Sequence, residues 1–293
     1  MDFTDKKYLN DQSMEQLISC VKSDLASKAE KKYTNDQLAE RATLDDVDAL
    51  DDSLIPITTS EIETWWHDGE ITVSQVDSQG QYYLTQYFKT LAQAVTHVQG
   101  VPIGRTWSFH IGDAVTEAIP EDMLRANAYV SEVYVGKSIT SIGQYAFAEM
   151  TALKKLHVYA NISEVPTGIA YQSTAMEECI LDKGTVLNGG CLASTTGLTT
   201  LQLPSNLVTV KGGALSNIGV TELDFMNTTI ATIENGAVYS ASLNSVKLPS
   251  TITTMGAYSF SGCSGVTVRI KKKTTVANSP WGITNAKVIY DHT

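Results

Sequence analysis

The sequence repeats itself every 22 to 23 residues between about Thr116 and Ile270, and this period limits the possible folds more than any other feature. One unit reads ITSIGQYAFAEMTALKKLHVY, and its start recurs near residues 116, 139, 162, 184, 207, 230 and 252. A period of this length is typical of stacked coils, in which one unit alone cannot enclose its apolar side chains. We therefore expect a solenoid rather than a globular domain.

Four apolar columns run through these units. The first column contains Ile119, Ile142, Val165, Leu187, Val210, Ile233 and Met255. The last column is a pair of apolar residues two positions apart, such as Val133 with Val135 and Leu156 with Val158. Because side chains alternate between the two faces of a strand, this spacing predicts one short strand per unit with a single buried face.

The residue between the two members of each pair is predicted to face away from the core. These residues form an outward ladder with rungs about 4.8 Å apart, consisting of Tyr134, His157, Ile180, Gln202, Asp224, Lys247 and Arg269. Flanking outward positions include Glu132, Lys155, Tyr159, Glu178, Asp182, Glu222, Ser245 and Lys271. Our candidate ligand-binding residues are Tyr134, His157, Tyr159, Gln202, Asp224, Lys247 and Arg269. The mixed chemistry favours a surface for a specific partner, and a merely solvated strand face is the alternative.

Recurring glycines mark the bends between the predicted strands. Gly143, Gly212, Gly236 and Gly256 fall at bends that recur along the units. We expect these positions to use a positive φ, which glycine adopts without steric cost.

The units at residues 139–158 and 248–270 resemble BspA-type leucine-rich repeats, which follow a pattern with L-P, I-G, A-F and a closing apolar pair. The resemblance covers roughly 155 of the 293 residues. It implies an α+β repeat solenoid, curved and with short parallel strands, whose strand face serves adhesion or ligand binding. It also implies a binding class rather than a catalytic one.

The first 54 residues have a different character. Residues 1–70 carry 17 acidic and 7 basic side chains, whereas residues 71–293 carry 15 acidic and 14 basic ones. Helical spacing places a narrow apolar stripe on this charged segment, and such a stripe needs a partner to pack against. We predict helices that attach and oligomerise the chain, as a trimer by preference, through Met14, Leu17, Val21, Leu25, Leu44, Val47 and Leu54.

Residues 55–111 are predicted to form a small mixed cap domain, and residues 112–293 the solenoid with its C-terminal cap. Within the cap domain, Glu70–Val76 alternates like a strand, and the apolar spacing over Tyr82–Val98 indicates a helix. At the other end, Val288–Tyr290 is predicted to form a final strand that closes the core together with Trp281.

The opening DKKYLNDQSMEQLISCVKSDLASK resembles the first helices of tail-associated structural proteins of bacteriophages and prophages. This resemblance implies a non-enzymatic virion protein, a tail appendage, fibre or receptor-binding protein. Its partners would be a host-surface protein or glycan and other virion tail proteins. The alternative is a bacterial BspA-like surface or secreted adhesin, or another protein-binding repeat protein.

Several other classes of protein are disfavoured. The net charge of −11 argues against binding to nucleic acid through phosphate contacts. The sequence contains no run of about 18 apolar residues that could span a membrane. Its start also lacks the apolar core of a signal peptide. The sequence carries none of the common hydrolase, nucleotide-binding or metalloprotease motifs, and its four cysteines lack metal-site spacing. We therefore expect no enzyme activity, cofactor or metal.

Overall fold

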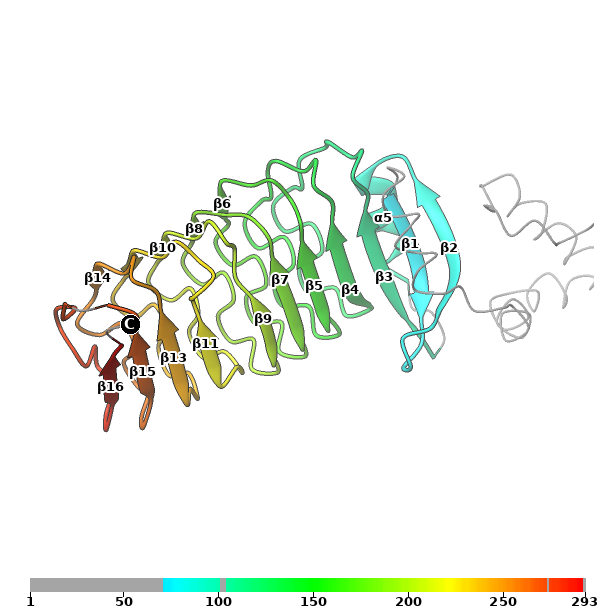
Figure 1. Cartoon of the computed structure of the whole chain (residues 1–293). Coiled ribbons are helices and arrows are strands. Elements are labelled where there is room, and N and C mark those ends of the chain that lie inside the picture. The colour runs from blue at the N-terminus through cyan, green and yellow to red at the C-terminus, as the bar shows by residue number, and fades with distance from the viewer. Residues whose placement is uncertain (1–70, 101–103, 273, 292–293) are drawn as a thin grey trace, which may run out of the picture.

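The structure is a computed structural model that describes residues 71–100, 104–272 and 274–291. In this part of the chain, coils follow one another in sequence order and form an elongated parallel-strand solenoid (Figure 1). The helices predicted over residues 1–54 lie outside the described residues. So do all the predicted attachment residues, namely Met14, Leu17, Val21, Leu25, Leu44, Val47 and Leu54.

The longer strands of the coils lie side by side along one wall of the solenoid (Figure 1). They form a seven-stranded sheet in the order β2-β1-β3-β4-β5-β7-β9 and a four-stranded sheet in the order β11-β13-β15-β16. Strand pairs from β3 onward are parallel. The coil strands are β4 (Val130–Val135), β5 (Lys155–Val158), β7 (Glu178–Leu181), β9 (Thr200–Gln202), β11 (Glu222–Asp224), β13 (Ser245–Leu248), β15 (Thr267–Ile270) and β16 (Lys287–Tyr290).

A second parallel sheet covers another side of the solenoid. Its strands contain two residues each and are ordered β14-β12-β10-β8-β6. They are β6 (Glu164–Val165), β8 (Val186–Leu187), β10 (Thr209–Val210), β12 (Thr232–Ile233) and β14 (Thr254–Met255). Each strand ends on a buried member of the first apolar column, so this column faces the core as the repeat predicted.

Turns form the remaining side of each coil and also bond to one another in register. The backbone N–H of Phe147 donates to the carbonyl of Ile169, and the same bond recurs from Ala170 to Cys191. In most coils two turn residues four positions apart have a positive φ, as do Tyr145 and Glu149. Stacking therefore satisfies backbone groups on all sides of the coil, even where the conformation is one that L-residues seldom adopt.

The prediction of a positive φ for the recurring glycines is correct for Gly236 and wrong for Gly143, Gly212 and Gly256. At Gly143 the cause is close packing, because an added Cβ would lie 2.5 Å from the carbonyl carbon of Pro120 in the preceding coil. A Cβ at Gly256 would likewise lie 2.6 Å from the backbone nitrogen of Asn235. These glycines allow two coil backbones to approach one another.

The N-terminal end of the described solenoid consists of an antiparallel hairpin and one helix. β1 (Ile71–Val76) pairs with β2 (Tyr82–Phe88) on one side and with β3 (Thr106–Ile111) on the other. The predicted strand near Glu70–Val76 is confirmed, but the predicted helix over Tyr82–Val98 is wrong in its first half, where β2 lies. Only α5 (Leu91–His97) is helical, and the Thr90 side chain caps it by accepting a hydrogen bond from the Gln93 N–H.

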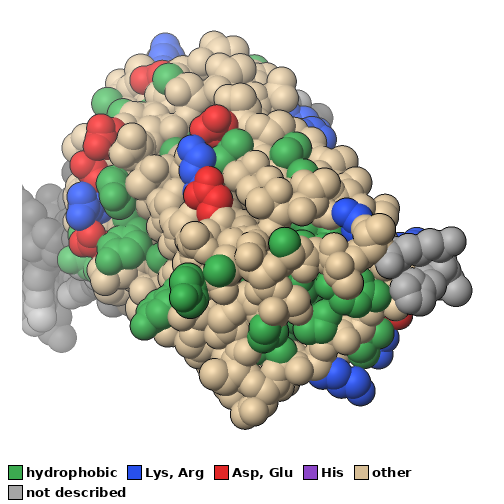
Figure 2. Space-filling view, turned by 90° about the vertical axis from the view of Figure 1, so that its left-hand side faces the viewer, with side chains coloured by type: hydrophobic (Ala, Val, Ile, Leu, Met, Phe, Trp, Pro, Cys, Tyr) green, Lys and Arg blue, Asp and Glu red, His purple; other side chains and the backbone are tan. Residues whose placement is uncertain are grey.

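Apolar side chains from the three sides fill one continuous core. Cys179, Cys191 and Cys263 are buried in it as free thiols. At the C-terminal end, Trp281 is fully buried and β16 extends the four-stranded sheet, which confirms the predicted final strand. Figure 2 looks onto this end, where hydrophobic side chains appear in separate groups among polar and backbone atoms. The last coil therefore closes the core.

Candidate functional site

The outward side of the longer strands forms the candidate site, which we call the strand face. In the first sheet, backbone pairing aligns Tyr134 with His157, then Ile180, then Gln202. In the second group of strands, Asp224 aligns with Lys247 and then with Arg269. The ladder derived from the sequence is therefore present in register, in two parts that meet between β9 and β11.

The structure adds one rung at each end of this ladder. His110 on β3 aligns with Tyr134, and Ile289 on β16 aligns with Arg269. His110 could have been found from the sequence, because Phe109 and Ile111 flank it as a buried apolar pair like those of the repeats. His110 lies outside the repeat pattern because β3 precedes the first complete unit.

Aromatic rings gather at the N-terminal part of the strand face. The His110 and Tyr134 rings stack at 4.3 Å with an interplanar angle of 19°. The His157 ring packs edge-on against Tyr134 at 4.9 Å, and Tyr159 packs edge-on against His157 at 6.1 Å. We call these four residues the aromatic cluster. Such contacts contribute beyond simple burial and hold the rings in fixed positions.

A buried carboxylate lies beside this cluster, two residues before Tyr134 on the same side of β4. Glu132 is 5% exposed, and its Oε2 accepts hydrogen bonds from the hydroxyls of Tyr82 at 2.5 Å and Ser108 at 3.1 Å. Lys155 Nζ lies 3.0 Å from Oε1. Burial acts to raise the pKa of Glu132, but the Tyr82 hydrogen bond and the Lys155 charge outweigh it and hold the pKa below its usual value.

This carboxylate fixes the proton position on His110. Ionised Glu132 only accepts hydrogen bonds, so the single Ser108 hydroxyl proton is donated to it. Ser108 Oγ lies 2.7 Å from His110 Nε2, which must then donate. Nδ1 is left as a bare acceptor, and it has no hydrogen-bond partner in the described part of the chain. Burial lowers the pKa of His110 to about 4, so the ring is neutral near pH 7.

His157 links the aromatic cluster to the next coil. Its Nε2 lies 3.4 Å from Oε1 of Glu178, beyond ideal hydrogen-bonding geometry. Burial lowers the pKa of His157 and outweighs the attraction of Glu178 for its charged form. The N-terminal part of the strand face therefore presents neutral rings between carboxylates and a lysine.

The C-terminal part of the strand face is ionic instead. Lys247 Nζ contacts the carboxylates of Glu222 at 2.5 Å and Asp224 at 3.3 Å. The hydrogen bond from Lys247 is the largest cause of the lowered pKa of Glu222. One coil further on, Arg269 lies 3.9 Å from Asp291. Because these ion pairs are solvent-exposed, they add little to the stability of the fold. Their main effect is to set the pattern of charge on the strand face.

The structure thus brings the predicted site residues into two groups. Tyr134, His157 and Tyr159 join His110 in the aromatic cluster, and Asp224 contacts Lys247. Gln202 is exposed between the two groups. Glu132 lies on the outward side of β4, as predicted for a flanking position, but it is buried there. Its burial could not be predicted because its partner Tyr82 lies 50 residues away in the chain.

The described residues contain no group of three or more His, Cys, Asp or Glu side chains placed to hold a metal ion. The Glu132 carboxylate is already saturated with donors, and His110 is stacked and buried. This arrangement suits a rigid recognition surface. Among residues 71–100, 104–272 and 274–291, no helix has the length and hydrophobicity needed to cross a bilayer.

Comparison with known protein families supports the repeat identified in the sequence. A family model described as the BspA type leucine rich repeat region matches residues 117–237 and 168–280. Together the two matches span residues 117–280, which is more than half of the chain. No curated protein matches the sequence.

One solved structure that is similar is the crystal structure of a leucine-rich repeat protein from Bacteroides ovatus. It is 17% identical, with a TM-score of 0.39, and the alignment covers 61% of this chain and 54% of that one. The chain therefore spans about half the length of this relative.

Proposed function

Since the chain belongs to the BspA-type leucine-rich repeat family, we propose that it is a non-enzymatic binding protein whose strand face engages a protein partner. The observation that carries this proposal is the strand face itself. Within each of its two sheets the rungs stay in backbone register, yet along the face their side chains change from aromatic to acidic to basic. A surface with fixed spacing and non-repeating chemistry suits one complementary protein better than a regular polymer.

The two parts of the strand face supply different contributions to such an interface. Half-buried rings in the aromatic cluster are already ordered, so they lose little conformational freedom on binding. The exposed charges of Asp224, Lys247 and Arg269 suit the rim, where they select the partner and speed association. We therefore place the energetic centre of the interface near Tyr134 and His157.

The setting in which this binding occurs is a second part of the proposal. The resemblance of the first residues to phage tail-associated proteins supports a tail appendage that attaches through residues 1–54 and binds a host-surface protein or glycan. BspA-type repeats are typical of bacterial surface or secreted proteins, which supports the adhesin alternative equally. Co-sedimentation of the chain with purified virions supports the first setting, and recovery only from bacterial surface fractions supports the second.

Exchange of exposed charges tests the strand face without disturbing the core. The double variant Lys247→Glu/Arg269→Glu is expected to lose most partner capture from extracts of the source organism or its host, measured by quantitative mass spectrometry. The matched control is Lys137→Glu/Lys183→Glu, which makes the same charge change on exposed lysines outside the strands. Equal loss in both variants, or in neither, would contradict the proposal.

The triple variant Tyr134→Ala/His157→Ala/Lys247→Ala tests the ladder as a whole. We expect partner binding to disappear while the solenoid still melts cooperatively. Unchanged binding would reject the strand face as the site. Light scattering of the full chain and of a variant lacking residues 1–54 separately tests attachment, because an oligomer that becomes a monomer on deletion is the expected result.

A further inference from the structure

The strand face is interrupted at one place, between β9 and β11. In the described part of the chain, no backbone hydrogen bond joins these two strands, whereas β9 pairs with β7 and β11 pairs with β13. Most Cα–Cα distances between β9 and β11 exceed 8 Å, although strands that pair lie about 4.8 Å apart. Figure 1 shows β11 standing apart from β9. We call the opening between Thr200–Gln202 and Glu222–Asp224 the slot.

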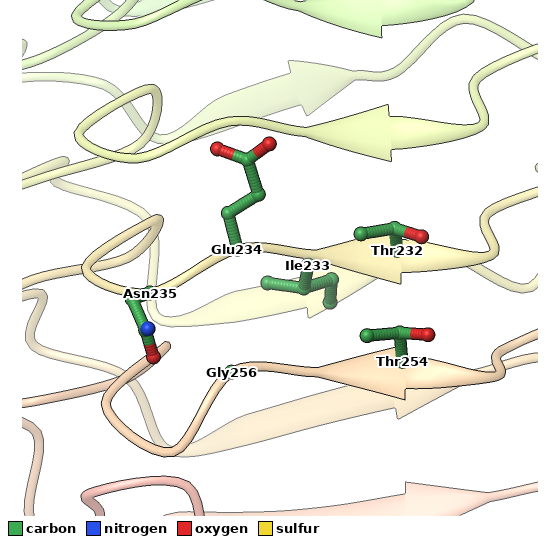
Figure 3. Close-up of a pocket in the computed structure, with 6 residues that line it drawn as sticks. All are labelled: Thr232, Ile233, Glu234, Asn235, Thr254 and Gly256. Carbon is green, nitrogen blue, oxygen red and sulfur yellow. The ribbon is translucent and has the colours of Figure 1, made fainter.

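The other two sides of the same coils stay closed. In the second sheet, β8 of one coil pairs with β10 of the next. Figure 3 shows the same close stacking one coil further on, where Thr232 of β12 lies in register with Thr254 of β14. In the turns, the N–H of Leu192 donates to the carbonyl of Ala214. The slot is therefore a wedge that opens on the strand face.

Both edges of the slot present unpaired backbone groups. Along a strand, the N–H groups of successive residues point to opposite edges. The N–H of Phe225 bonds to β13, so those of Glu222 and Asp224 point into the slot. The N–H of Thr200 bonds toward β7, so that of Leu201 points into the slot from the other side. None of these three groups has a backbone partner among the described residues. Such edges are templates for a further strand.

The core is incompletely covered at the slot. Leu201 and Leu203 are the inward apolar pair of this coil, and both are only half-buried. The matching pair of the preceding coil, Cys179 and Leu181, is 0% exposed. Apolar side chains that stay partly in water forgo part of the free energy of burial. An apolar side chain that entered the slot would cover both leucines and recover it.

The outward side chains beside the slot determine which charge suits an occupant. Those on β9 are Thr200 and Gln202, which are uncharged, and those on β11 are Glu222 and Asp224. Lys247 contacts both carboxylates from β13, so these three side chains together keep one net negative charge. Lysine or arginine beside this group is favoured, and a carboxylate is repelled.

We propose that the slot receives an extended segment of the partner protein as an added β-strand. This inference rests on the proposed function and specifies how the partner binds. The backbone of the segment bonds to the edges of β9 and β11, its apolar residues face Leu201 and Leu203, and the alternate residues, lysine or arginine, face outward near Glu222. A strand seated between two others holds them about 9.6 Å apart, twice the usual spacing. The added strand joins the two sheets of the strand face into one.

The test uses a fluorescein-labelled hexapeptide of alternating lysine and valine, and fluorescence anisotropy measures its binding to the full chain. Salt at about 0.15 M screens general attraction to the acidic protein. The matched peptide has the same composition, with its lysines in one block and its valines in another. It carries the same charge but cannot place lysine and valine on opposite faces of a strand. We expect it to bind at least about tenfold more weakly than the alternating peptide.

A proline variant tests the edge of the slot. Leu201→Pro removes an N–H that points into the slot and keeps those that pair with β7, so proline is tolerated as at a sheet edge. It should weaken binding of the alternating peptide by about tenfold. The matched control is Val288→Pro on β16, where the N–H groups of Lys287 and Asp291 bond back to the preceding coil and that of Val288 points outward. This control should bind as the unmodified chain does, and melting curves verify both folds.

Hydrogen exchange of the unmodified chain tests the slot without any variant. The amides of Leu201, Glu222 and Asp224 should exchange faster than those of β5 and β13, which are paired on both sides. Addition of the alternating peptide should slow the exchange of these three amides and leave β5 and β13 unchanged. Nuclear magnetic resonance resolves the individual amides.

Three results would overturn the proposal. The first is no binding of the alternating peptide, or equal binding of the block peptide. The second is binding that Val288→Pro removes and Leu201→Pro retains, which places the peptide at the end of the sheet. The third is slow exchange of the three slot amides in the free chain, which shows that the slot is closed.

This inference and the proposed function fail separately. Lys247→Glu/Arg269→Glu should lose the partner but still bind the alternating peptide, because the charge change adds negative charge beside the slot. Capture of the partner that persists in Leu201→Pro and is lost in Lys247→Glu/Arg269→Glu would contradict the added strand. The strand face would then still be the binding site.

Discussion

The Tyr82 hydroxyl donates a hydrogen bond of 2.5 Å to Oε2 of Glu132, although the two residues are 50 positions apart. Tyr82 belongs to the hairpin strand β2, and Glu132 belongs to β4 of the first coil. The bond therefore ties the N-terminal hairpin to the first coil, next to the aromatic cluster.

We predict that Tyr82→Phe lowers the free energy of unfolding by about 1.5–3 kcal/mol, the usual contribution of a hydrogen bond to a charged group. Urea unfolding followed by circular dichroism measures this loss. Tyr239→Phe is the control, because Tyr239 is exposed and should show no change. Equal stability of Tyr82→Phe and the unmodified chain would show that the bond contributes nothing.

Stability is predicted to rise with pH between about 4 and 6.5 because of His110. Its pKa is lowered from 6.5 to about 4 in the folded chain, so in this range the unfolded chain binds the proton and the folded chain does not. The total effect is roughly 3 kcal/mol, since each pKa unit corresponds to about 1.4 kcal/mol. Lowered pKa values at Glu132 and His157 act in the same direction.

The variant His110→Gln isolates this contribution. Unfolding free energies measured at intervals from pH 4 to 7 should rise less steeply for His110→Gln than for the unmodified chain. Identical slopes in the two proteins would exclude His110 as the source.

Two glycines are predicted to tolerate alanine differently. Gly143→Ala brings a Cβ against the backbone of Pro120 and Glu121, and neither can move without shifting a coil. We expect a loss of about 3 kcal/mol. In Gly236→Ala the added Cβ meets open space, and the only strain comes from the positive φ of 66°. We expect this strain to lower the free energy of unfolding by about 1–2 kcal/mol. Thermal melting compares them, and a larger loss at Gly236 would contradict the packing account.

The core cysteines are predicted to resist thiol reagents. Burial raises the pKa of Cys191 to about 12 and also raises the pKa of Cys179 and Cys263. In a Cys20→Ser variant, Ellman's reagent should find no reactive thiol in the native chain and all three after guanidinium unfolding. Rapid labelling without denaturant would show that the coils open readily.

The repeats could be predicted from sequence because each coil repeats one pattern of buried residues. The pairs Val133 with Val135 and Val246 with Leu248 face the core as their spacing indicates. This periodicity also fixed the strand register, and with it the ladder from Tyr134 to Arg269.

The hairpin could not be predicted in the same way. Leu84, Phe88 and Leu91 have helical spacing, but the turn after Asp77 and the pairing of β2 with β1 override that pattern. The burial of Glu132 also escapes sequence reasoning, because it depends on a contact across 50 residues.

The most direct test of partner binding by the strand face is site-specific photocross-linking. A benzophenone amino acid replaces Gln202 or Arg269 on the strand face, or Val208 beside β10 on the second sheet, all of them exposed. After irradiation with extracts of the source organism or its host, mass spectrometry identifies the attached proteins. We predict that Gln202 and Arg269 capture the same protein and that Val208 does not. Capture of that protein from Val208 alone would contradict it.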